Sequence, residues 1–108
     1  MSHIDSIEVG PKGFRLISVA GALEVTWPQI RQVVAFKRDR LAVDDLCLSI
    51  LVGERRLEVD EDMPGWEELL GALDSKIMGV TPSSEWRPRV VYPPFARNEE
   101  VIFRRAEL

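Results

Sequence analysis

The stretch between Trp27 and Asp62 decides the fold; it contains WPQIRQVVAFKRD at residues 27–39, DLCLSI at residues 45–50 and EVDED at residues 58–62. Apolar residues alternate with others along 46–52 and again along 57–59, a period of two that is typical of a strand with one face in the core. The Gly53-Glu54 pair between these runs predicts a two-residue hairpin connection. Residues 31–37, rich in β-branched and aromatic side chains, predict a further strand. This stretch therefore predicts a small antiparallel sheet.

The flanking residues extend the sheet and add one helix. Residues 14–19 and 23–27 predict a first hairpin, and residues 101–103 predict a last strand. Between Pro64 and Ile77 an apolar stripe recurs at helical spacing; its members are Trp66, Leu69, Leu70, Leu73 and Ile77. The predicted fold class is α+β, with a curved antiparallel sheet of five to seven strands, a partial barrel, packed by one amphipathic helix. Three segments follow from this interpretation: a lead-in (1–12), the sheet plus helix (14–78), and a loop with the terminal strand (80–108).

The composition is that of a single globular domain covering residues 1–108. The chain is 45% hydrophobic and 30% charged, far from the composition of disordered segments. A formal net charge of -4 argues against a general nucleic-acid binder, because such domains usually carry a basic excess. The single cysteine, Cys47, excludes an internal disulfide and fits a reducing compartment. The N-terminus lacks a signal-peptide pattern, and no apolar run approaches ~18 residues, so we expect a cytoplasmic location and no membrane span.

The sequence contains no recognisable catalytic apparatus, and no cofactor is predicted. Nucleophilic catalysis needs a nucleophile held by a base, but the single histidine is His3, and Cys47 stands at a strand position that suits a packed residue. No Gly-rich loop leads into a helix to cradle a phosphate. One acidic group could hold a hard cation, although a solvated strand face is the simpler interpretation; its members are Asp44, Asp45, Glu58, Asp60 and Asp62.

A basic group is the first candidate interaction site. Lys37, Arg38 and Arg40 lie in a predicted charged turn, and Arg31 on the adjoining strand could join them. Three cations on one turn could bind a phosphate, an acidic partner or a lipid head group. The alternative is that they pair with the nearby aspartates at positions 39, 44 and 45, as surface charges commonly do.

An aromatic group is the second candidate interaction site. Trp86, Tyr92 and Phe95 lie in a Pro-rich segment that is interpreted as an ordered loop. Large aromatic side chains in such a loop either plug the open side of a core or form a partner-binding edge. Plugging is favoured, because exposed apolar patches are uncommon on monomers.

Several of these residues carry a resemblance to known families. The pattern Trp27-x-x-Ile30-x-x-Val33, followed by Phe36-Lys37-Arg38-Asp39, Asp45-Leu46-Cys47-Leu48 and Gly65-Trp66-x-x-Leu69, resembles small bacterial proteins of unassigned function in which a strand meander precedes one helix. It also resembles pleckstrin-homology-like domains over residues 14–78. The resemblance implies a fold and no functional residue. Pleckstrin-homology domains usually end with their helix, whereas about thirty residues follow it here.

The leading functional hypothesis is a non-catalytic intracellular binding or adaptor module that acts through contacts with an unknown protein partner. One alternative is a metal- or small-ligand-dependent enzyme that uses the acidic group. Another is head-group binding at a membrane surface through the basic turn. Exposed strand edges could also pair two copies into a homodimer.

Overall fold

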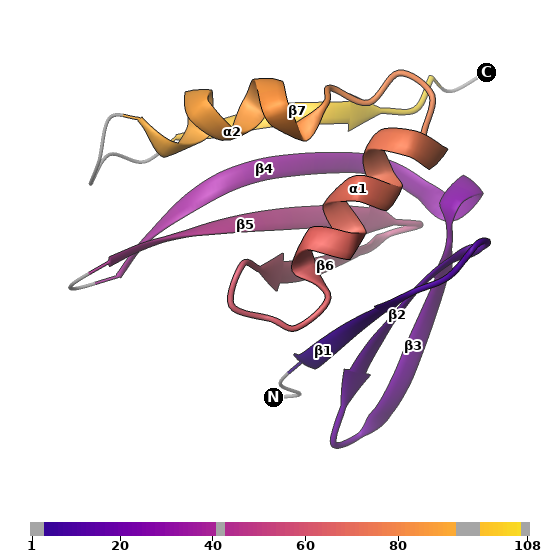
Figure 1. Ribbon diagram of the computed structural model, residues 1–108. Helices are drawn as coiled ribbons and strands as arrows, with labels where there is room; N and C mark the ends of the chain where they lie inside the picture. Colours follow the sequence, from indigo (N-terminus) through magenta and orange to yellow (C-terminus); the bar gives the residue numbers. More distant parts are fainter. Residues whose placement is uncertain (1–3, 41–42, 93–97, 107–108) are drawn as a thin grey trace.

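The computed structural model describes residues 4–40, 43–92 and 98–106. Within these ranges the fold is α+β, with seven strands in two antiparallel sheets and two helices (Figure 1). The elements are β1 (Ile4–Val9), β2 (Gly13–Ser18), β3 (Gly21–Thr26), a short 3-10 turn (Trp27–Gln29), β4 (Ile30–Arg40), β5 (Val43–Val52), β6 (Arg55–Asp60), α1 (Trp66–Lys76), α2 (Ser83–Val91) and β7 (Glu99–Arg104).

The smaller sheet has the order β1-β2-β3. The predicted first hairpin is present as β2 and β3, but the segment interpreted as a lead-in forms β1. A register shift between Ile4 and Ser6 interrupts the period of two that would have revealed this strand in the sequence. The side chain of Ile7 is buried, and its backbone N–H donates to the carbonyl of Pro64 at 2.8 Å. Tertiary contact therefore holds β1 in place.

The larger sheet has the order β6-β5-β4-β7. The predicted second hairpin is confirmed, because Val52 pairs with Arg55 across the two-residue connection. The segment 37–40, predicted to be a charged turn, instead continues β4, and Arg38 pairs with Asp45 of β5. Cross-strand pairing thus keeps these polar residues extended although their composition suggests a turn.

Helix α1 confirms the predicted stripe, since Trp66, Leu69, Leu70, Leu73 and Ile77 are all buried. The prediction of one helix was wrong, because residues 83–91 form α2 where a loop was expected. Pro82 stands at the N-cap, before the first helical residue, so its missing N–H removes no hydrogen bond within the helix. Ser83 is fixed by Asp74, whose carboxylate accepts a hydrogen bond from the Ser83 hydroxyl at 2.7 Å. Burial of the α2 residues one turn apart, Trp86 and Val90, outweighs the helix-breaking tendency of the internal Pro88.

One hydrophobic core joins both sheets and both helices. The rings of Phe14 and Trp27 pack with centroids 5.9 Å apart where the small sheet meets the turn into β4. Helices α1 and α2 lie on the same side of the four-stranded sheet (Figure 1). The opposite face of that sheet is not covered by any helix of the described residues, so we call it the open face. No helix in the described ranges is long and apolar enough to cross a membrane.

Candidate functional site

The residues of the predicted basic turn belong to β4, and the alternation of side chains along this strand places them on opposite faces of the sheet. Lys37 belongs to the core side of the strand and is 3% exposed, whereas Arg38 lies on the open face. Successive strand residues point to opposite faces, so two neighbours in sequence serve different purposes here. The side chain of Arg40 lies outside the described residues.

Lys37 is a structural cation. Its Nζ donates to the carbonyl of Val91, the last residue of α2, at 2.8 Å. The amide of Asn98 donates to the carbonyls of Val90 and Tyr92 at 3.1 and 2.7 Å. These donors satisfy carbonyls that a helix C-terminus leaves unpaired, and a positive charge there is favoured by the helix dipole. Lys37 therefore holds the end of α2 against β4.

Arg38 lies at the centre of the predicted acidic group. Its guanidinium contacts Glu58 at 2.5 Å, Asp60 at 3.3 Å and Asp45 at 3.9 Å. Burial acts to lower the pKa of Arg38, but the surrounding acidic groups outweigh it and raise the pKa. Three of the five predicted carboxylates thus surround an arginine. No group of three or more potential metal ligands occurs among the described residues.

The remaining acidic residues do not extend this arrangement. Asp62 lies beyond the end of β6, where its backbone N–H donates to Asp60 at 3.0 Å. The side chain of Asp44 is outside the described residues. Cys47 pairs in register with Phe36 and is fully buried. Burial raises the pKa of the Cys47 thiol to about 12, against the lowering effect of Arg38, so the thiolate that nucleophilic chemistry requires is strongly disfavoured.

The other predicted interaction residues are dispersed. The Nη1 of Arg31 donates to the carbonyl of Gly53 at 2.9 Å, which places it at the β5–β6 hairpin. Trp86 is 1% exposed within the core, and Tyr92 just after α2 is 68% exposed. Phe95 lies outside the described residues. Trp86 therefore packs as a core residue, and the structure brings no described pair of the aromatic group together.

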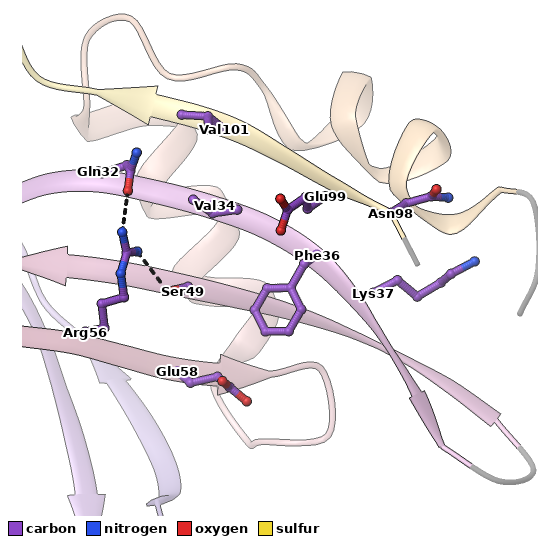
Figure 2. Close-up of a pocket in the computed structure, with 10 residues that line it drawn as sticks. All are labelled: Gln32, Val34, Phe36, Lys37, Ser49, Arg56, Glu58, Asn98, Glu99 and Val101. Atoms are coloured by element: carbon purple, nitrogen blue, oxygen red, sulfur yellow. Dashed lines mark hydrogen bonds between the residues drawn. The ribbon is translucent and has the colours of Figure 1, made fainter. Parts of the chain in front are cut away.

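The open face contains a groove of about 830 Å³ that spans all four strands of the larger sheet. Figure 2 shows the side chains that line it. Val34 and Phe36 of β4 are half-buried at its centre, and Val101 of β7 is 44% exposed. Val34 pairs in register with Val101, so these apolar side chains form one continuous patch, here called the apolar floor.

Two oppositely charged side chains flank the apolar floor. Arg56 of β6 is exposed and donates to the neutral acceptors Ser49 and Gln32 at 3.2 and 2.9 Å. Glu99 of β7 is exposed, and its carboxylate makes no hydrogen bond or ion pair within the described part of the chain. Arg56 likewise has no carboxylate partner there. Each charge is thus held on the open face without a counter-ion from the described residues.

Sequence reasoning did not identify this face. Val34 and Phe36 were assigned only to a strand, and the pairing of β4 with the distant β7 is what exposes them beside Val101. The one available signal was the near-continuous apolar run in β4, which places apolar side chains on both faces of the strand. Comparisons with models of protein families, with curated proteins and with solved structures gave no match.

Proposed function

We propose that this chain is a non-catalytic intracellular protein-binding module whose recognition surface is the open face. The observation that supports this most directly is the apolar floor of Val34, Phe36 and Val101, which no helix of the described ranges covers. Protein interfaces typically combine an apolar centre with a polar rim. Arg56, Glu58 and Glu99 supply such a rim around the groove.

The two alternatives have weaker support in the same geometry. A carboxylate-based metal enzyme needs acidic oxygens available to a cation, and Arg38 already occupies Glu58 and Asp60. Head-group binding by a basic turn needs neighbouring exposed cations, and Lys37 is buried beneath α2. No specific feature of the described residues favours either alternative function.

The pleckstrin-homology-like relationship stays a prediction. It is supported by the number of antiparallel strands and by the packing of α1 against them. Two features depart from that pattern: both helices precede β7, and the two sheets do not close into a barrel. The proposed function does not depend on this relationship.

The test is an affinity purification from the native host with three baits: wild type, Val101→Glu and Val19→Glu. Val101 lies on the apolar floor, whereas Val19 lies in the β2–β3 turn of the small sheet and is 93% exposed. We expect wild type and Val19→Glu to retain the same stoichiometric protein, and Val101→Glu to lose it. Mass spectrometry identifies the retained protein, whether a different chain or an untagged copy of this one. Retention by Val101→Glu, or no retention by any bait, would contradict the proposal.

A further inference from the structure

Arg56 and Glu99 lie on the two edge strands of the open face, on opposite sides of the apolar floor (Figure 2). Arg56 lies on the edge strand β6 beside the β5–β6 hairpin, and Glu99 begins the other edge strand, β7. One surface therefore carries a cation and a carboxylate that no described residue neutralises, with an apolar floor between them. A second exposed cation, Arg104 of β7, is in register with Gln32 on the same face. From this self-complementary pattern we propose that the open face binds a second copy of the same chain, face to face. This inference rests on the proposed function and names its partner.

The strand register gives the geometry of this contact. Three strand spacings separate β6 from β7, or about 14 Å across the sheet. Along the strands, Arg56 is in register with Leu51, which pairs with Gln32, whereas Glu99 pairs with Phe36. Four residues at about 3.4 Å each give a further 14 Å along the strands, again by approximation. The two charges thus lie on a diagonal of a nearly square patch.

A two-fold axis can form the same Arg56–Glu99 ion pair at both ends of this diagonal. If the axis lies between the two sheets and is perpendicular to the diagonal, it places Arg56 of each copy opposite Glu99 of the other. Because the patch is nearly square, the strands of the two copies then cross at about 90°, which is one of the two preferred ways for sheets to stack. Such an interface is isologous, as closed dimers require.

The centre of the same contact is apolar. The two-fold axis passes near the middle of the patch, so Val34 of one copy meets its counterpart in the other. Phe36, in register with Glu99, lies toward the corner that faces Arg56 of the other copy. The axis also passes close to Arg104, so the two copies of this exposed side chain must extend away from each other. Removing the half-buried side chains of Val34 and Phe36 from water is favourable. Arg56 is pre-oriented by its bonds to Ser49 and Gln32, so little side-chain freedom is lost when it pairs with a carboxylate.

The test is sedimentation velocity of wild type, Arg56→Glu, Glu99→Arg and an equimolar mixture of the two variants. We expect a wild-type dimer and, for each single variant, a dissociation constant raised about 100-fold or more, since like charges then meet at two places. In the mixture, the glutamate introduced by the first variant faces the arginine introduced by the second, and the two native side chains face each other, so both ion pairs are restored. The mixture should therefore form a heterodimer. Lys12→Glu, in the exposed turn between β1 and β2, is the control for charge reversal away from the open face and should remain dimeric.

Three results would overturn the inference: a monomeric wild type at the highest soluble concentration, dimers that persist in both single variants, or a mixture that stays monomeric. Persistent dimers would indicate another surface, such as edge-to-edge strand pairing. Thermal unfolding of each variant establishes that it is folded, and the neutral pair Arg56→Gln and Glu99→Gln, which should weaken the dimer less, provides a second series. The two proposals can fail separately. If sedimentation shows a monomeric wild type, but affinity purification shows that wild type retains a different protein and Val101→Glu loses it, the homodimer is refuted and the proposed function stands.

Discussion

Replacing Lys37 with methionine tests the assignment of this residue to the end of α2. Methionine keeps an unbranched apolar side chain of similar length, with sulfur in place of one methylene, and lacks the ammonium group. In the variant, the carbonyl of Val91 loses the hydrogen bond that it accepts from Nζ at 2.8 Å. The site is 3% exposed, so water does not readily replace the lost donor.

The expected loss is about 1.5–3 kcal/mol in the free energy of unfolding, because a hydrogen bond to a charged donor contributes about that much. A cation at a helix C-terminus adds roughly 0.3–1 kcal/mol. Relief of the ammonium group from burial offsets part of this sum. For a domain near 100 residues, the loss corresponds to a Tm lower by roughly 6–24 °C.

The assay is urea unfolding followed by tryptophan fluorescence, because Trp86 lies in the helix that Lys37 holds. The control is Lys12→Met, which removes the same charge from an exposed turn and should change stability by less than about 0.5 kcal/mol. If Lys37→Met is as stable as Lys12→Met, Lys37 does not anchor α2. A variant of normal stability that loses a binding partner would instead return Lys37 to the candidate interaction residues.

Three further predictions concern the backbone, the thiol and the response to pH. Gly65→Ala should destabilise the protein by more than about 1 kcal/mol, because Gly65 has φ +95° and an added Cβ would lie 1.9 Å from the carbonyl oxygen of Ile7. Gly71→Ala, in open space on α1, should stabilise the protein by roughly 0.5–1 kcal/mol. Equal effects of the two substitutions in urea titrations would contradict the conclusion that only position 65 requires glycine. Cys47 should resist a disulfide-exchange reagent in the native protein at neutral pH and react once urea unfolds it, because burial raises its pKa to about 12; rapid native labelling would show that the thiol is accessible. The hydrogen bonds from Arg87 lower the pKa of Glu67, so their contribution to stability is fully present above the unfolded-state pKa of about 4.3 and is lost as the pH falls through the lower folded-state value. Glu67→Gln should therefore be less stable than wild type at neutral pH and approach its stability in acid. A stability difference that does not change with pH would exclude the ion pair as its cause.

Local periodicity predicted the parts of the fold that depend on one element at a time. The stripe of α1 and the hairpin at Gly53 follow from spacing alone, because a helix and a two-residue turn each impose a short repeat. The β1 strand and α2 did not follow from spacing. β1 carries a register shift near its start, and α2 is stabilised by the burial of Trp86 and Val90 against distant elements. Tertiary contacts stabilise both β1 and α2, and a short segment of sequence does not contain the residues that make these contacts.

The candidate site was less predictable than the fold for a related reason. The charged segment 37–40 was interpreted from its composition, which says that cations are present and not which face each one occupies. Extending β4 through this segment sends Lys37 to the core and Arg38 to the open face. Strand ends are the least predictable part of a strand, and an error of a few residues is enough here. Where the sequence predicts one basic site, the structure has a cation at the end of α2, Lys37, and an ion-pair cluster around Arg38.

The same alternation explains why one strand can serve both packing and recognition. Along β4, Val33, Ala35 and Lys37 face the helices, whereas Val34 and Phe36 face away from them. Substitutions in the first set act on stability, as Lys37→Met tests, and substitutions in the second set should act on association with little cost to folding. A charge reversal that included both Lys37 and Arg38 would mix the two effects and could not locate a binding surface. Variants at exposed open-face positions, Arg56, Glu99 and Val101, separate them, because none of these side chains belongs to the buried core.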